Sequence, residues 1–134
     1  GICYSVTPGR RRLENFYFFF DREQHLRDAT AKAACSAHLD TTRIAADAVF
    51  RPELLKCKTL CVANKQENDF IYFSRVNVDQ LLFFLRENAY PPELVSFVDT
   101  HRSELDHLLY DVGFDYRMED GELRALKSGY YGFF

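Results

Sequence analysis

VGFDYRMEDGELRALK, residues 112–127, holds two strand-like runs on either side of the turn Glu119-Asp120-Gly121. The Asp-Gly pair suits a tight turn with positive φ, and such turns join neighbouring antiparallel strands. We therefore predict a β-hairpin that pairs Val112–Met118 with Glu122–Phe134.

Two earlier parts of the chain show the same arrangement of aromatic and β-branched runs around a polar turn. One pairs Ile2–Thr7 with Leu13–Phe20, and the other pairs Cys57–Ala63 with Phe70–Arg75. Because hairpin strands run antiparallel, the three hairpins predict one antiparallel sheet of about six strands.

Helix-like stretches fill the gap between the first two hairpins. Asp21 is placed to cap a helix that runs to about His38. Asp40 or Thr41 can cap a second, shorter helix, which Pro52 would end.

The gap before the last hairpin also predicts two helices. Asn77 is placed to cap the first of them, and Tyr90-Pro91-Pro92 interrupts it. The prolines can start the next helix. Its apolar stripe comprises Leu94, Val95, Val98, Leu105, Leu108 and Leu109.

The predicted order of elements is ββ-αα-ββ-αα-ββ within a single domain over residues 1–134. Each helix pair returns the chain to the same sheet, so the helices are expected on one face only. The fold class is therefore α+β, with a curved antiparallel sheet of about six strands and helices on one face. Such a sheet would be a partial barrel or one that an oligomer completes.

Composition argues against several classes of protein. The chain has 17 Lys and Arg against 20 Asp and Glu, and the net charge of -3 gives no general attraction to nucleic acid or anionic lipid. No apolar stretch approaches the ~20 residues of a membrane span, and the start lacks a signal-peptide pattern. We expect a soluble, cytoplasmic protein whose four cysteines are reduced.

Motifs of known catalytic, metal or cofactor sites are missing from the sequence. The six glycines form neither GxGxxG nor GxxxxGK, and the four histidines form no HExxH. Cys35 and His38 are spaced as half a metal site, but a surface histidine beside a core cysteine is the better interpretation. Cys57 or Cys61 could act as a thiol nucleophile beside His107, but no sequence motif of catalytic cysteines supports this. We expect no metal and no cofactor.

Cationic and phenolic side chains are frequent on the predicted strands. They comprise Lys56, Lys58, Tyr72, Tyr116, Arg124, Lys127, Tyr130 and Tyr131. On one interpretation they form the wet face of an open sheet, opposite the helices. On the other, the sheet curls until this face lines a cavity. Lys and Arg would then hold an anionic group while aromatic rings stack on an organic ligand.

The repeated hairpins and helix pairs resemble the ABBA-type aromatic prenyltransferases, whose barrel of antiparallel strands is ringed by helices. The segments that carry the resemblance are residues 112–116, 120–124 and 127–131, with a weaker match over residues 70–74. The resemblance implies binding of an aromatic or isoprenoid-like ligand. It also implies transfer of an allylic prenyl group from its diphosphate to an aromatic acceptor.

The resemblance also implies six ligand-binding residues. Those expected at the diphosphate are Lys58, Arg124 and Lys127. Those expected to shield the allyl cation are Tyr72, Tyr116 and Tyr131. The chain departs from the family because six strands are too few for its ten-stranded barrel. Glu14 is the only candidate for the base that removes the ring proton, so no catalytic residue is assigned.

A non-catalytic protein-interaction domain is the alternative function. Gly129–Phe134 is an aromatic run that would be prone to aggregate as an open sheet edge. We therefore expect a neighbouring chain, a second copy included, or a further segment to pair with it. At the level of sequence, ligand binding and strand pairing both stay open.

Overall fold

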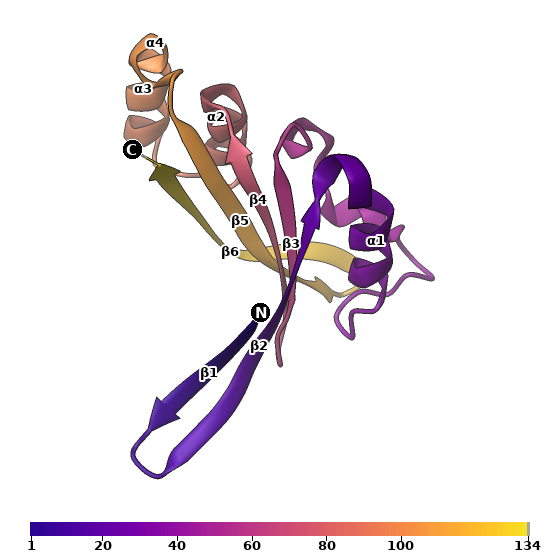
Figure 1. Cartoon of the computed structure of the whole chain (residues 1–134). Coiled ribbons are helices and arrows are strands. Elements are labelled where there is room, and N and C mark those ends of the chain that lie inside the picture. Colours follow the sequence, from indigo (N-terminus) through magenta and orange to yellow (C-terminus); the bar gives the residue numbers. More distant parts are fainter. Residues whose placement is uncertain (134) are drawn as a thin grey trace.

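The protein forms one antiparallel sheet whose six strands lie side by side in chain order (Figure 1). A computed structural model describes residues 1–133. The strands are β1 (Ile2–Thr7), β2 (Arg10–Asp21), β3 (Thr59–Asn64), β4 (Asp69–Val76), β5 (Leu109–Glu119) and β6 (Glu122–Phe133). Within the described residues β1 and β6 each pair on one side only, so the sheet is open. The predicted strand end at Phe134 lies outside these residues.

The turn between β5 and β6 has the predicted geometry. Asp120 and Gly121 both take positive φ, 52° and 84°, which is the conformation that the Asp-Gly pair favours. The turn sets the register in which Glu119 lies opposite Glu122, and a register shift between Asp115 and Tyr116 then brings Leu109 opposite Phe133. The hairpin prediction is confirmed.

Side-chain caps define where the first two helices begin. The helices are α1 (Arg22–Ala34), α2 (Val78–Glu87), α3 (Pro92–Thr100) and α4 (Arg102–Leu105). The Asp21 carboxylate accepts from the first free N–H groups of α1, and Asn77 forms a reciprocal capping box with Gln80. Within the described residues, no helix has both the length and the apolar character to cross a bilayer.

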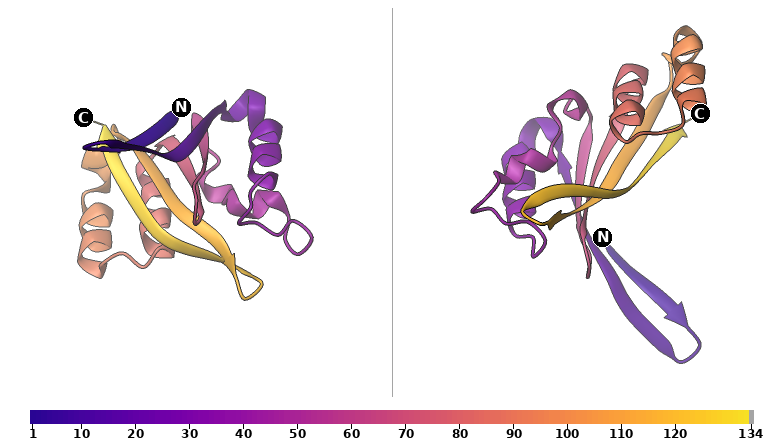
Figure 2. Two further views of the ribbon diagram at one scale, coloured as in Figure 1. Left: turned by 90° about the horizontal axis from the view of Figure 1, so that it is seen from below. Right: turned by 180° about the vertical axis from the view of Figure 1, so that it is seen from behind.

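The helices pack on one face of the sheet. Alternate residues of the central strands form a single buried core with helical residues. Its strand members include Leu60, Val62, Ile71, Phe73, Val112 and Phe114, and its helical members include Ala29, Ala33, Leu81, Leu85 and Val98. Helix α1 stands at the β2–β3 end of the sheet, while α2 and α3 stand at the other end (Figure 2). The predicted α+β fold, a curved open sheet with helices on one face, is confirmed.

The predicted second helix after Asp40 is wrong. The segment instead contains two short 3-10 turns, Ala46–Val49 and Pro52–Leu54. The Asp40 carboxylate accepts from the Thr42 N–H and hydroxyl, which favours a local turn over a helix start.

The last predicted helix is too long. It breaks at His101, whose φ of -95° and ψ of 17° separate α3 from the single turn α4. Leu109, expected on the helical stripe, is the first residue of β5 and is exposed. Its segment joins the sheet because β5 finds backbone partners on both β4 and β6.

Strand β2 takes part in two pairings. Its first half pairs only with β1, and Phe16–Asp21 pairs with β3. Residues 2–16 therefore project beyond the rest of the sheet as a two-stranded arm (Figure 1).

Candidate functional site

The face of the sheet without helices, called the open face below, carries three rows of residues that lie opposite one another across the strands. The middle row is Phe19, Cys61, Tyr72, Gly113 and Gly129. The row toward the Lys58 end is Thr59, Ser74, Asp111 and Tyr131. The row toward the β3–β4 turn is Tyr17, Ala63, Phe70, Asp115 and Lys127.

A hollow of about 430 Å³ lies at the Lys58 end of this face. Its lining, which defines the cationic hollow, comprises Phe19, Lys58, Thr59, Tyr72, Ser74, Arg75 and Asp111. A second hollow of about 390 Å³ shares Lys58 and Arg75 with it and is also lined by Arg22 and Lys56. Four cationic side chains therefore gather beside two aromatic rings.

The backbone fixes the position of Lys58. Its N–H donates to the Ser74 carbonyl at 2.9 Å, and its carbonyl accepts from the Arg22 N–H at 3.1 Å. Lys58 is thus tied to β4 and to the start of α1, although it lies just outside β3. Its ammonium group can reach a ligand from a rigid base.

A β-bulge places Arg75 in the same hollow. The pairing of β4 with β5 shifts register between Ser74 and Val76, and Arg75 takes a φ of 63°. A left-handed conformation costs about 1–3 kcal/mol for a residue with a side chain, and such strain is common at binding sites.

Most of the cationic charge in the hollows is not neutralised by the protein. Among residues 1–133, the only ion pair of these cations is that of Arg22 with Glu23 at 3.6 Å. Asp21, which also lines the second hollow, is already occupied in capping α1. Lys56, Lys58 and Arg75 form no ion pair in the described part of the chain and can contact an anionic group, although the carboxylates of Glu23 and Asp111 also line the hollows.

Asp111 connects the cationic and aromatic parts of the hollow. It is buried, and its carboxylate accepts from the Tyr72 hydroxyl and, at 2.9 Å, from the Arg75 N–H. Burial, and then the hydrogen bond to Asp111, raise the pKa of the Tyr72 phenol above its ordinary value. Tyr72 is therefore a neutral phenol held in one orientation.

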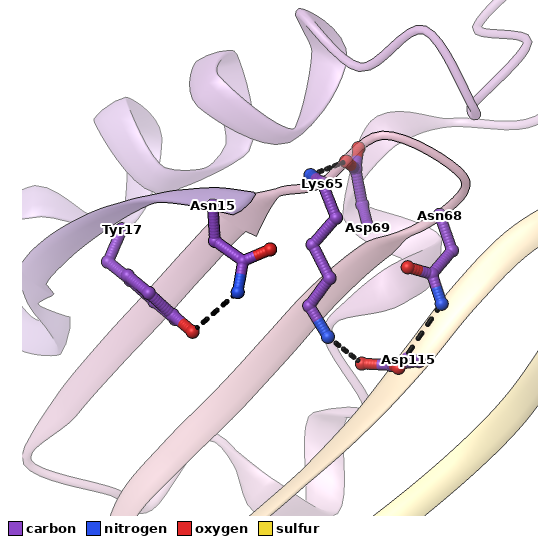
Figure 3. A network of polar contacts seen from close by, with 6 residues as sticks. All are labelled: Asn15, Tyr17, Lys65, Asn68, Asp69 and Asp115. Atoms are coloured by element: carbon purple, nitrogen blue, oxygen red, sulfur yellow. Dashed lines mark hydrogen bonds and ion pairs between the residues drawn. The ribbon is translucent and has the colours of Figure 1, made fainter. Parts of the chain in front are cut away.

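The other end of the open face is neutralised internally. The Lys65 ammonium lies 2.6 Å from Asp115, and the Asn68 amide donates to the same carboxylate at 3.2 Å (Figure 3). The Asn15 amide donates to the Tyr17 hydroxyl at 2.9 Å nearby. Lys65 and Asp115 neutralise each other in this network, while Lys127, which lies opposite Asp115, forms no ion pair within residues 1–133.

The structure separates the sequence-predicted site residues into three groups. Lys58 and Tyr72 line the cationic hollow, and Tyr131 lies opposite Asp111 on β6. Lys127 lies opposite Asp115, two rows away from Asp111. At ~3.3 Å per residue, the distance along β5 between Asp111 and Asp115 is ~13 Å. Arg124 lies farther along β6 and pairs with Glu122 at 3.3 Å. Lys58, Lys127 and Arg124 therefore cannot hold one diphosphate together.

The placement of Tyr116 on the polar strand face is wrong. Its side chain is wholly buried on the helix face, opposite Asp69, because it alternates in phase with Val112 and Phe114. Its hydroxyl has no hydrogen-bond partner among the described residues. Burial, with a smaller contribution from Asp69, raises the pKa of this phenol.

We expect Tyr116→Phe to keep or increase stability by up to about 1 kcal/mol, because it removes a buried hydroxyl that lacks a partner. Tyr110→Phe is the matched control, since the Tyr110 hydroxyl donates to the Leu105 carbonyl at 3.4 Å. That variant should lose stability in urea unfolding. A greater loss for Tyr116→Phe than for Tyr110→Phe would contradict this assignment.

The two buried cysteines are not activated as nucleophiles. Burial raises the pKa of the Cys57 and Cys61 thiols to about 11, so neither is a thiolate at neutral pH. Residues 1–133 contain no group of three His, Cys, Asp or Glu side chains placed to hold a metal ion.

A larger hollow of about 570 Å³ lies on the helix side, between α1 and the 3-10 turns. Leu26, Phe50, Pro52 and Leu55 give it an apolar lining, and its charged groups, Arg27 and Asp47, are of opposite sign. It has neither the convergent cations nor the fixed phenol of the cationic hollow, which is therefore the better candidate site.

Comparisons with protein-family models, curated proteins and solved structures gave no match. Sequence reasoning missed Arg75, Asp111 and Phe19 as site residues. Side chains alternate along β2, so Phe19 points to the open face while Phe18 and Phe20 point to the helix face. This alternation could be read from the sequence.

Proposed function

We propose that the open face binds a small organic ligand with an anionic head. Lys58 and Arg75 would hold the head, and Phe19, Tyr72 and Tyr131 would contact an apolar or aromatic body. The single observation behind the proposal is the gathering of unneutralised cations and aromatic rings around the cationic hollow. Cations and ring faces in one site suit an isoprenoid or aromatic diphosphate.

The most specific form of the proposal is prenyl transfer. In this reaction the allylic C–O bond breaks, and the bonding pair leaves with the diphosphate. The allyl carbon then bonds to a ring carbon of the acceptor, and that carbon loses its proton to a base. Lys58 and Arg75 would stabilise the leaving diphosphate, and Phe19 and Tyr72 would shield the cation.

Few carboxylates are placed to act as the base that accepts the ring proton. Glu14 accepts from the Ser5 hydroxyl at 2.6 Å on the arm, away from the hollow. Asp111 is the one carboxylate among the described residues that line the cationic hollow. We assign it the role of proton acceptor if transfer occurs at this site.

We expect geranyl diphosphate to stabilise the protein by about 2.7 kcal/mol at 100 times its dissociation constant, read as a rise in Tm. Lys58→Ala and Arg75→Ala should each weaken this binding at least tenfold. Lys127→Ala is the matched control, because Lys127 lies at the other end of the open face. The proposal would be wrong if no diphosphate raised the Tm of the wild-type protein. It would also be wrong if all three variants lost affinity for geranyl diphosphate equally.

Pairing through β6 is the second candidate function. The outer edge of β6 has no paired strand among the described residues. Tyr131 lies on this strand and is 67% exposed. An exposed aromatic edge strand can add a strand from a partner. Tyr131→Asp should then dissociate any complex that uses this edge.

The proposal includes a cytoplasmic location. All four cysteines are free, and free thiols, two of them buried, suit a reducing compartment.

A further inference from the structure

The two faces of the arm differ sharply in polarity. One face presents Ile2, Tyr4, Val6 and Phe16, which are 59%, 56%, 69% and 42% exposed. The register places Ile2 opposite Phe16 and Tyr4 opposite Leu13, so these side chains form an apolar stripe. Val6 continues the stripe to the tip, where it lies opposite Arg11. The stripe continues the helix face of the sheet through Phe18.

The other face of the arm is polar, and several of its side chains are bonded to one another or to the β3–β4 turn. The Ser5 hydroxyl donates to Glu14 at 2.6 Å, and Arg12 lies 3.7 Å from Glu14 and donates to Gln66. The exposure of the apolar stripe is therefore not a general feature of the arm. It belongs to one face only.

The helix layer ends before it reaches the stripe. The Lys32 ammonium of α1 lies 4.3 Å from the centre of the Phe18 ring, at the base of the arm. Beyond Phe18 the stripe stays exposed in the described part of the chain. On the central strands β3, β4 and β5 the same face is covered by helices, and its apolar side chains are buried.

We propose that this stripe docks on the same stripe of a second copy of the chain, about a two-fold axis. Four large apolar side chains at these exposures offer roughly 400–500 Å² per copy. Two copies would bury roughly 900 Å² of apolar surface, near the lower limit of a specific interface. A weak dimer that forms as concentration rises is therefore expected.

The charges on the arm favour an antiparallel arrangement of the two stripes. Arg10 and Arg11 lie at the tip, and neither has an ion-pair partner among residues 1–133. An arm of six residue pairs is ~20 Å long, so antiparallel packing keeps the two tips well beyond a Debye length of ~8 Å. It also lays each Arg11 near the Phe16 ring of the other copy, which favours cation–π contact.

The test is sedimentation velocity across the micromolar range. The wild-type mass should rise from one chain to two, and Tyr4→Glu with Val6→Glu should raise the dimer dissociation constant at least tenfold. Both side chains are exposed, so circular dichroism should show an unchanged fold. Thr7→Glu on the polar face and Tyr131→Asp on β6 are controls that should keep the dimer.

Three outcomes would overturn the proposal. The first is a wild-type protein that stays monomeric at every concentration. The second is a dimer that dissociates with Tyr131→Asp but not with the arm variant, which would assign the contact to β6. The third is a monomer that binds phosphatidylserine vesicles through the arm, which would make the stripe a membrane contact.

Discussion

Gly113→Ala is expected to destabilise the protein by about 2–3 kcal/mol, because an added methyl group overpacks the centre of the sheet. A Cβ atom at Gly113 would lie 2.6 Å from Phe70 Cζ, 2.7 Å from the Ile71 carbonyl oxygen and 3.0 Å from Tyr72 Cδ2. The Ile71 carbonyl belongs to the strand backbone and cannot move aside. Phe70 and Tyr72 would have to shift, so the variant should also weaken ligand binding at the cationic hollow.

Gly129→Ala is the matched control for this variant. Gly129 lies directly opposite Gly113 on β6, and a Cβ atom there would meet nothing within 4 Å. The added side chain reduces the freedom of the unfolded chain, so its effect on urea unfolding should be within about 1 kcal/mol. Equal losses for the two variants would mean that the packing of Phe70 and Tyr72 over Gly113 is not as described.

Asp111→Ala is expected to lower the free energy of unfolding by about 2–4 kcal/mol, because two donors lose their acceptor in a buried site. These donors are the Tyr72 hydroxyl and the Arg75 N–H. The variant should also lower the pKa of Tyr72, because the Asp111 hydrogen bond and charge both raise it. Ultraviolet titration, with Tyr72→Phe subtracted, measures this change separately from stability.

Asp99→Ala is the control for Asp111→Ala. Asp99 pairs with Arg86 at 3.0 Å, but both side chains are about half exposed. An exposed pair of this kind contributes about 0.2–1 kcal/mol. If Asp111→Ala costs no more than Asp99→Ala, Asp111 does not organise the hollow.

Local chemistry made much of the fold predictable from sequence. The Asp120-Gly121 turn, the Asp21 and Asn77 caps and the prolines before α3 each act within a few residues of themselves. The alternation of apolar residues then set which face of each strand is buried. Tyr116 was misplaced although it follows Val112 and Phe114 at even spacing, so the information was present in the pattern.

The cationic hollow depends on long-range geometry, which explains why Arg75 and Asp111 were missed as site residues. Strict alternation puts Arg75 on the face opposite Ser74, and only the bulge turns it into the hollow. Asp111 follows a stretch expected to be helical, and it joins the hollow because β5 starts at Leu109. Neither the bulge nor the strand start has a signal in the neighbouring residues.

Chemical-shift mapping by NMR tests the central claim most directly, which is that the open face holds the ligand site. On addition of geranyl diphosphate, we expect the amide signals of Thr59, Tyr72, Ser74 and Asp111 to shift. Those of Ala29 and Leu81, in the core on the helix side, should stay in place. Shifts confined to the helix side, or no shifts at saturating ligand, would contradict the account.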